Sequence, residues 1–315
     1  MLSKVVMGRL GNQMFQYAAM RAIQERLYPN ETVNLIFSQI ERNGSKEDGF
    51  VNQLDVFNIN TEKVVYDQKL KLTLHQNILV LWYFLRRKMI KIFSKSEDYE
   101  DKKRKFEIKV QDKYNRNGLY LFSYGYYDFK KTNKEDKLFI GFFESQKFFN
   151  DIRETIIEEF TPKEPPLEKN KNMYRKIMSS ESICVSVRRG DFLKDRFKDS
   201  TYVCTPEHFS KAIDLVKRKV KNPRFVVFSD DIDWVRKEMD FPKDTIYETG
   251  DDPLWEKIRL MYSCKHFIIS NSTFSWWAQY LSRNDEKIVV APSVWRKTGY
   301  GGDDLYDNRW YLVKA

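Results

Sequence analysis

The sequence has little of what usually marks a metal-binding or disulfide-bonded protein. Its 315 residues include only three cysteines and three histidines, which are scattered along the chain: Cys184, Cys204, Cys264, His75, His208 and His266. There is no CxxC pair and no cluster of cysteine with histidine, so neither a disulfide scaffold nor a zinc site is indicated. We expect no bound metal ion and no cofactor.

Long apolar runs are also missing. No run approaches the length that spans a bilayer, and the chain starts directly in a strand-like segment without a signal peptide. The segment 78–93 is apolar first and then basic and aromatic, which suits a helix that lies on an anionic membrane surface. We favour the alternative, a helix packed inside the protein with its arginines in solvent. The prediction is a cytoplasmic protein, with peripheral contact at the inner membrane face left open for this segment.

Neither charge sign is scarce, but basic residues prevail. The chain has 55 Lys and Arg against 45 Asp and Glu, a formal net charge of +10, and 15% of its residues are aromatic. This balance suits an anionic small ligand, an anionic membrane or a nucleic acid. Because the basic residues are dispersed, we expect no nucleic-acid partner. A basic nucleic-acid-binding protein stays the alternative from a different functional class.

The second half of the chain alternates between strand-like and helix-like segments. Strands are predicted at five places: 182–187, 224–228, 245–248, 267–270 and 287–291. Amphipathic helices are predicted between them, so we expect a parallel sheet covered by helices, an α/β fold. The best linker is the proline-rich stretch 161–166. We therefore expect two domains, 1–163 and 164–315, with the extreme C-terminus able to pack back on the first.

Polar motifs follow three of the predicted strands. Arg188-Arg189-Gly190-Asp191 follows the first strand, Ser229-Asp230-Asp231 the second, and Asn271-Ser272-Thr273 the fourth. The carboxyl ends of parallel strands meet at one edge of a sheet, where α/β proteins bind their ligands. We therefore expect the three motifs to converge.

The three motifs together suit a guanine nucleotide. Paired arginines grip diphosphate oxygens through forked hydrogen bonds, and Ser272, Thr273 and the N–H groups of the next helix can bind further oxygens. Asp230 or Asp231 can accept hydrogen bonds from N1 and N2 of guanine, a pair of donors that pyrimidines and adenine lack. The expected donor substrate is a GDP-sugar.

A glycine loop follows the first strand of the chain. Gly8 and Gly11 precede a helix with apolar residues at helical spacing, and Asn12 is a candidate N-cap. Backbone N–H groups at such a loop can hold an anion. From this segment alone, an ordinary tight turn between strand and helix is the better interpretation.

Five motifs resemble those of glycosyltransferase family 11, the α-1,2-fucosyltransferases, whose signatures are related to those of the α-1,6- and protein O-fucosyltransferases. They are MGRLGNQMFQYA (7–18), GFFESQKFF (141–149), VRRGD (187–191), FSDD (228–231) and SNSTFSWWA (270–278). The resemblance implies the GT-B arrangement, two Rossmann-like domains that face each other across a cleft. The first domain would hold the acceptor and the second the GDP-sugar.

The resemblance also implies a reaction. It is the inverting, metal-independent transfer of L-fucose from GDP-β-L-fucose to the 2-hydroxyl of a terminal galactoside, in the synthesis of surface polysaccharide or glycoconjugate. A fucosyltransferase of another linkage is the alternative within this class. Asp231 and Asp233 have the DxD spacing of a metal motif from another glycosyltransferase fold. We discount it, because Asp233 should fall in a first helical turn, where an acidic residue is favourable anyway.

Roles for single residues follow from the same resemblance. Arg188 and Arg189 are expected to stabilise the leaving diphosphate, and Arg9 to approach it or the acceptor from the facing domain. Further donor contacts are expected from Gly8, Gly11, Asn12, Ser186, Asp230, Asp231, Asn271, Ser272 and Thr273. Asp191 is the candidate general base, although orienting the arginines or capping a turn suits it nearly as well.

Acceptor contacts are expected from Glu144, Gln146 and Trp276. Glu144 is also the second candidate for the base, but Glu144-Ser145-Gln146 reverses the usual order of this motif. Trp276 could stack on a sugar, while core packing is the stronger interpretation for at least one residue of its tryptophan pair. Ser186 stands where the family has histidine, which leaves its backbone as the main candidate for donor binding.

Overall fold

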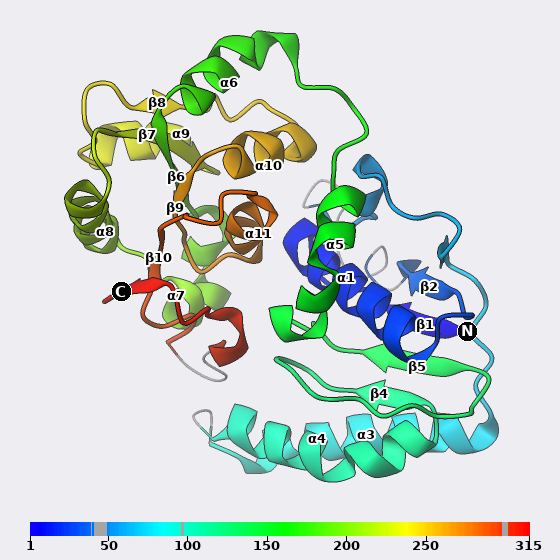
Figure 1. Ribbon diagram of the computed structural model, residues 1–315. Helices are drawn as coiled ribbons and strands as arrows, with labels where there is room; N and C mark the ends of the chain where they lie inside the picture. Colours follow the sequence, from blue (N-terminus) through cyan, green and yellow to red (C-terminus); the bar gives the residue numbers. More distant parts are fainter. Residues whose placement is uncertain (39, 41–48, 96–97, 298–301) are drawn as a thin grey trace. The chain divides into compact units, whose positions relative to one another are not determined.

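The computed structural model describes residues 1–315 apart from 39, 41–48, 96–97 and 298–301, and apart from the side chains of residues 191 and 195–197 (Figure 1). The chain divides into two compact units. Unit 1 comprises Met1–Glu159 and Gly302–Leu305, and unit 2 comprises Phe160–Gly301 and Tyr306–Ala315.

Unit 1 is built on a five-stranded parallel sheet in the order β3-β2-β1-β5-β4. Its strands are β1 (Leu2–Val5), β2 (Val33–Ile36), β3 (Val64–Tyr66), β4 (Leu119–Leu121) and β5 (Lys137–Ile140). Its helices are α1 (Leu10–Leu27), α3 (Leu74–Phe93), α4 (Tyr99–Arg116) and α5 (Arg153–Glu159), with short 3-10 turns η1 (Leu54–Val56), η2 (Gln146–Phe148), η3 (Asn150–Ile152) and η6 (Asp303–Leu305).

Helix α1 is buried on almost all sides. Its sequence permits this because alanines and uncharged side chains occupy nearly all of its faces. The one buried cation on it, Arg21, forms an ion pair of 2.8 Å with Glu159, and the hydroxyl of Tyr17 donates to the same carboxylate. A buried charge is tolerable when it is paired and hydrogen-bonded in this way.

Helices α3 and α4 lie side by side at the lower edge of unit 1 in Figure 1. The interpretation favoured from the sequence, that 78–93 packs inside the protein, is wrong. Only Gln76, Leu79 and Tyr83 of α3 are buried, and Tyr83 contacts Tyr114 of α4. One narrow side of α3 therefore covers the unit, and most of its apolar side chains face outward.

Unit 2 is built on a six-stranded parallel sheet in the order β11-β10-β9-β6-β7-β8. Its strands are β6 (Glu181–Val187), β7 (Pro223–Ser229), β8 (Ile246–Tyr247), β9 (His266–Ile268), β10 (Val289–Pro292) and β11 (Tyr311–Val313). Its helices are α6 (Lys171–Met178), α7 (Asp195–Thr201), α8 (Pro206–Lys219), α9 (Ile232–Glu238), α10 (Leu254–Tyr262) and α11 (Thr273–Leu281), with 3-10 turns η4 (Glu168–Asn170) and η5 (Gly190–Leu193). The predicted fold class, α/β with two Rossmann-like units, is confirmed.

The proline-rich stretch after α5 belongs to unit 2 and is fastened to α10. Arg259 donates from Nη2 to the carbonyl oxygens of Pro162 and Glu164, and its Nη1 lies 3.1 Å from an oxygen of the buried Glu256. The same glutamate accepts a hydrogen bond from the backbone N–H of Leu167. The Arg259–Glu256 pair thus contacts this stretch at three backbone positions.

The chain returns to unit 1 once, near its end. Asp304 of η6 accepts from the backbone N–H of Tyr126 at 2.8 Å and pairs with Lys147 at 2.7 Å. The last segment then adds β11 to the edge of the unit 2 sheet.

Candidate active site

The loop after β6 is held by two arginine–aspartate pairs that bridge it to the end of β7. The register places Val187 beside Ser229, so the residues that follow these strands meet. Arg188 Nη1 lies 2.7 Å from Asp230 Oδ2, and Arg189 Nε lies 3.1 Å from Asp231 Oδ2. The convergence expected from the strand order is therefore present at this edge.

Two further contacts and one glycine fix the geometry of these pairs. The backbone N–H of Arg189 donates to Asp230 Oδ1 at 2.9 Å, so both oxygens of that carboxylate accept hydrogen bonds from the loop. The guanidinium of Arg189 lies 3.3 Å from the centre of the Trp234 ring, a cation–π contact. A Cβ on Gly190 would lie 2.4 Å from Asp230 Oδ2, so only glycine lets the carboxylate sit where Arg188 meets it.

The roles open to the two aspartates differ. Asp230 is held between Arg188 and Arg189, an arrangement that favours positioning of the arginines over contact with a nucleotide base. The side chain of Asp231 is the more accessible of the two, at 41% against 24% for Asp230, although over the whole residue Asp230 is the more exposed. Asp231 is therefore the better candidate for accepting N–H groups of guanine.

Ser186 and Asn271 face inward rather than toward a ligand. Ser186 Oγ lies 2.6 Å from Ser275 Oγ, which also lies 3.2 Å from Ser270 Oγ, so β6, the segment after β9 and α11 share a small buried hydroxyl cluster. Asn271 Nδ2 donates to the carbonyl oxygens of Thr201 and Trp295. Both side chains hold neighbouring loops together, which leaves their backbone groups as the candidates for ligand contact.

Helix α11 begins at the same edge, directly after β9. Ser272 is its N-cap and Thr273 its first residue, and Ser272 makes no side-chain capping hydrogen bond. Trp276 and Trp277 are both fully buried, with Trp276 stacked on Tyr280 at 5.0 Å and Trp277 edge-on to Phe160. This burial favours core packing for Trp276 over stacking on a sugar.

Asp191 lies in η5, immediately after the arginine pair. Its side chain falls outside the part of the chain that the structure describes. Its expected role as base or as partner of the arginines thus stays a prediction.

In unit 1, three glutamines hold the loop between β1 and α1. Gln16 accepts from the N–H of Met7 and donates to the carbonyls of Met7 and Asn12. Gln13 donates to the carbonyl of Gly8 at 3.1 Å, and Gln53 accepts from the N–H of Leu10 at 2.7 Å. Gln13 and Gln16 are fully buried. Sequence reasoning missed all three: Gln13 and Gln16 look like surface residues of a helix, and Gln53 lies in an irregular segment before η1.

The expected cap of this helix is wrong. α1 begins at Leu10 with Arg9 as its N-cap, and Asn12 lies inside the first turn. Gly8 adopts φ +75°, and a Cβ there would lie 2.4 Å from Asn12 Nδ2, and the helix begins three residues earlier than an Asn12 cap requires. Gly11 is a buried residue of the same turn.

The loop after β5 lies at the same edge of the unit 1 sheet, because β5 pairs with β1 in parallel. Gly141 has φ +155°, and a Cβ there would lie 1.8 Å from the carbonyl oxygen of Phe122. Phe143 has φ +53°, a conformation that non-glycine residues rarely adopt and that clusters at functional sites. Glu144 is buried and Gln146 half-buried in this bent loop.

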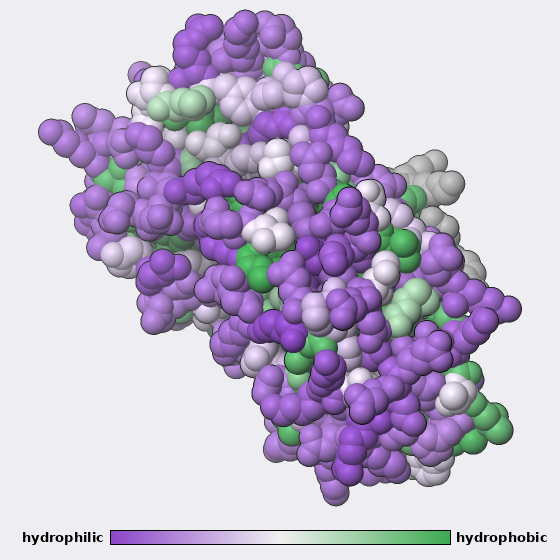
Figure 2. All heavy atoms as spheres, turned by 45° about the vertical axis from the view of Figure 1, so that its right-hand side comes forward, coloured by the Kyte–Doolittle hydropathy of each residue, from purple (hydrophilic) through white to green (hydrophobic). Residues whose placement is uncertain are grey.

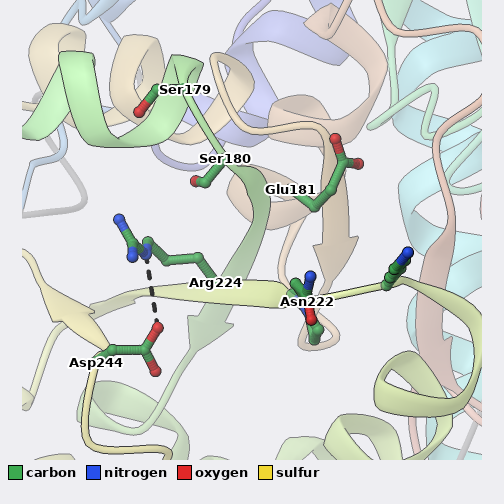
Figure 3. Close-up of a pocket in the computed structure, with 8 residues that line it drawn as sticks. Ser179, Ser180, Glu181, Asn222, Arg224 and Asp244 are labelled. Atoms are coloured by element: carbon green, nitrogen blue, oxygen red, sulfur yellow. Dashed lines mark ion pairs between the residues drawn. The ribbon is translucent and has the colours of Figure 1, made fainter.

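A surface hollow of about 630 Å³ lies at the opposite, amino end of the unit 2 strands (Figure 3). Its walls include Glu181 at the start of β6, and Arg224, which pairs with Asp244 at 3.6 Å. Lys265 donates to Glu181, and this hydrogen bond lowers the pKa of the Glu181 carboxyl. Glu181 and Arg224 are thus each paired with an opposite charge, and the edge with the arginine motif is the better candidate for chemistry.

Two findings concern metals and membranes. Among the residues that the structure describes, no group of three or more His, Cys, Asp or Glu side chains is placed to hold a metal ion. Within the same described part, no helix combines the length and apolar character that crossing a bilayer requires.

Comparison with known proteins gives consistent matches. The sequence profile of glycosyl transferase family 11 matches residues 1–314. An α-1,2-colitosyltransferase of Escherichia coli is 29% identical over 300 residues, which cover 91% of this chain and 90% of that protein. A galactoside α-(1,2)-fucosyltransferase 1 of Leontopithecus chrysomelas is 32% identical over 158 residues, 46% of this chain and 43% of that protein. The crystal structure of NodZ α-1,6-fucosyltransferase soaked with GDP-fucose superposes with a TM-score of 0.49 at 13% identity, covering 89% of this chain and 92% of that one.

Proposed function

Because this chain belongs to glycosyltransferase family 11, we propose that it transfers L-fucose from GDP-β-L-fucose to the 2-hydroxyl of a terminal galactoside. The transfer inverts the configuration at C1 and needs no metal ion. The α-1,2 linkage in the names of two relatives supports this proposal. The setting we propose is the synthesis of surface polysaccharide or glycoconjugate in the cytoplasm.

The observation that carries the proposal is the pair of arginines held by two aspartates at the carboxyl edge of the unit 2 sheet. In the reaction an acceptor oxygen attacks C1, the C1–O bond to the diphosphate breaks, and negative charge grows on the leaving GDP. Arginines that are already oriented stabilise such charge without reorganisation. Arg188 therefore takes the catalytic role, and Arg189 supports donor binding.

The rest of the donor site follows from the same edge. Asp231 would accept from N1 and N2 of guanine, while Asp230 positions the two arginines. Ser272, Thr273 and the first N–H groups of α11 would bind diphosphate oxygens, as helix N-termini do. In unit 1 the loop with Gly8, Arg9, Gly11 and Asn12 would bind substrate oxygens, and Glu144 and Gln146 the acceptor.

The acceptor hydroxyl must lose its proton, and Asp191 is the proposed base. If Asp191 is the base, Asp191→Asn lowers the transfer rate about a hundredfold or more while GDP affinity stays intact. If Asp191 orients the arginines instead, rate and GDP affinity fall together. Initial rates measured beside calorimetric GDP affinity decide between the two, and no loss of either moves the search to Glu144.

A second donor is favoured by one observation, the similarity to an α-1,2-colitosyltransferase over most of the chain. Colitose is L-fucose without its 3-hydroxyl, so GDP-colitose fits the same nucleotide site.

One experiment tests both donors. Purified protein is given GDP-fucose and GDP-colitose separately, each with a panel of β-galactosides, and NMR determines the product linkage. An α-1,2-fucosyl product supports the main proposal, a colitosyl product alone replaces the donor, and an α-1,6 linkage replaces the acceptor position. Stabilisation by short RNA or DNA but not by GDP would instead support the nucleic-acid alternative.

A further inference from the structure

Helix α3 exposes the side that a surface helix normally buries. Eight large apolar residues recur along it at spacings of one, three and four, which places them on one side of the helix: Leu74, Ile78, Leu81, Trp82, Leu85, Met89, Ile92 and Phe93. Each is more than two-fifths exposed, and Trp82, Ile92 and Phe93 reach 62%, 65% and 78%. The buried residue Tyr83 lies on the side facing the unit, and the buried Leu79 lies between it and the row.

The exposed apolar row on α3 is longer than the apolar patches that soluble proteins usually leave in solvent. A helix of 20 residues is about 30 Å long, and the apolar row runs along its whole length. Soluble proteins rarely expose a contiguous apolar patch of this kind unless it binds something. In Figure 2 hydrophobic side chains gather on the surface at the lower right, the end of unit 1 where α3 runs in Figure 1.

The charges beside the row indicate what covers it. α3 carries four basic residues and no acidic one. Arg86 falls on one side of the apolar row and Lys88 on the other, both exposed, and Lys91 lies exposed in the following turn. An apolar stripe with Trp and Phe, flanked by Lys and Arg, is the pattern of a helix that lies in the plane of an anionic lipid surface.

A second copy of the chain fits this face less well. Two α3 helices packed through their apolar rows would bring the flanking cations together, with no acidic side chain on either helix to neutralise them. An anionic bilayer supplies both the apolar depth and the opposite charge.

We propose that α3 docks this protein on the surface of an anionic lipid bilayer. The apolar row enters the boundary between headgroups and acyl chains, and Arg86, Lys88 and Lys91 contact the anionic headgroups. The inference rests on the face of α3 and is independent of the sugar that the protein transfers.

The test is co-sedimentation of the full chain with vesicles. Vesicles of phosphatidylcholine alone are compared with vesicles that also contain phosphatidylglycerol. We expect binding to the mixed vesicles, reduced at least tenfold in the variant Leu81→Gln/Leu85→Gln because both residues lose their burial in lipid. The matched control is Leu254→Gln/Leu312→Gln, the same change at two similarly exposed leucines away from α3, which should bind like wild type.

The charge contribution is tested separately. Arg86→Gln/Lys88→Gln/Lys91→Gln should lose about fivefold in binding per removed charge on mixed vesicles and little on neutral ones. The control changes three exposed lysines elsewhere to Gln, at Lys171, Lys211 and Lys237, and should keep the binding.

Three results would overturn the proposal. The first is no binding of the wild-type chain to mixed vesicles, and the second is an equal loss in the Leu254/Leu312 control. The third is a dimer in solution that Leu81→Gln/Leu85→Gln dissociates while vesicle binding stays absent, which would assign the face to a second copy. Stabilisation by GDP, measured on every variant, shows whether donor binding is intact, so this proposal and the proposed function can fail separately.

Discussion

The loops after β1 and β6 follow central strands of the two sheets, yet they are built from different interactions. The β1 loop is held by neutral amide groups, because Gln13, Gln16 and Gln53 satisfy its backbone N–H and carbonyl groups. The β6 loop is held by charges, through the pairs of Arg188 with Asp230 and of Arg189 with Asp231. One loop is a set of fixed dipoles and the other a set of paired ions.

The difference matters for what each loop can do. Buried amide hydrogen bonds are not screened by salt and leave the backbone of the β1 loop in one conformation. Ion pairs that are partly exposed contribute only about 0–1 kcal/mol to stability, so the aspartates serve mainly to orient the arginines rather than to stabilise the fold. The first loop suits precise positioning, and the second suits binding of a charge that grows during a reaction.

The largest expected effect is on the charged loop. Arg188→Ala should slow transfer by more than about 3 kcal/mol in activation free energy, over a hundredfold, because the oriented cation at the leaving diphosphate is lost. Initial rates with saturating GDP-fucose measure this, and circular dichroism checks the fold.

The matched control for this change lies at the other end of the same sheet. Arg224 lies at the start of β7 and pairs with Asp244 at 3.6 Å, so Arg224→Ala removes an aspartate-paired arginine from the amino edge. Its transfer rate should equal that of wild type. Near-normal turnover in Arg188→Ala, or an equal loss in Arg224→Ala, would mean that the carboxyl edge is not the site of the chemistry.

A smaller effect should come from Gly190→Ala, which keeps every charge. The added Cβ would lie 2.4 Å from Asp230 Oδ2, so the carboxylate must move away from Arg188. We expect about a tenfold loss of rate, as for a positioning contact worth roughly 1.4 kcal/mol, with stability nearly unchanged.

The double variant Gly190→Ala/Asp230→Ala identifies the route of that loss. If Gly190→Ala acts by displacing Asp230, the double variant is no slower than Asp230→Ala alone. Additive losses would show that Gly190 matters for a reason other than the Arg188–Asp230 pair.

The sequence predicted the charged loop better than the neutral one, and the reason is physical. Parallel strand order alone brings Arg188 and Asp230 to one edge, whereas the pairing of each arginine with its own aspartate depends on the register of Val187 beside Ser229. Glutamines in a helix carry no such signal, since the same residue type is common on exposed helix faces. The Asn12 cap failed because the positive φ of Gly8 starts the helix earlier.

The fold shows the same contrast. Strands β6, β7 and β9 fall within about two residues of their predicted positions, because apolar runs end in polar motifs there, and β10 does so on its apolar run alone. Helix α4 could not be recognised, since its buried positions are polar: Lys103, Glu107, Gln111, Tyr114 and Asn115. Glu107 accepts from the hydroxyl of Tyr83 and Gln111 donates to the carbonyl of Leu121, contacts that no apolar periodicity reveals.

On the neutral loop, Gly8→Ala should act on stability rather than on charge. At φ +75° an alanine is strained, and its Cβ would also meet Asn12 Nδ2, so we expect a loss of about 1–3 kcal/mol in unfolding free energy. Gly250→Ala is the matched control, because Gly250 has φ +92° but its nearest neighbour would be 3.8 Å from the new Cβ. Urea unfolding should show a larger loss for Gly8→Ala. Equal losses would mean that the contact with Asn12 contributes nothing to this loop.

The smallest expected effect is that of a chelator, and it tests whether the paired arginines alone neutralise the leaving group. Arg188 and Arg189 carry two positive charges at the edge where the diphosphate should lie, the same charge that a divalent cation would supply. Transfer in excess EDTA should therefore equal transfer without it, and added Mg²⁺ or Mn²⁺ should not raise the rate.

The informative comparison is with Arg188→Ala under the same conditions. If a cation restores that variant while leaving wild type unchanged, the arginine and a metal ion are interchangeable at this edge, which strengthens its assignment to the diphosphate. If EDTA instead stops the wild-type reaction and Mg²⁺ restores it, the arginines are not sufficient to neutralise the diphosphate. Asp231 would then be a metal ligand rather than a guanine contact, and Asp233, in the first turn of α9, would be its partner ligand.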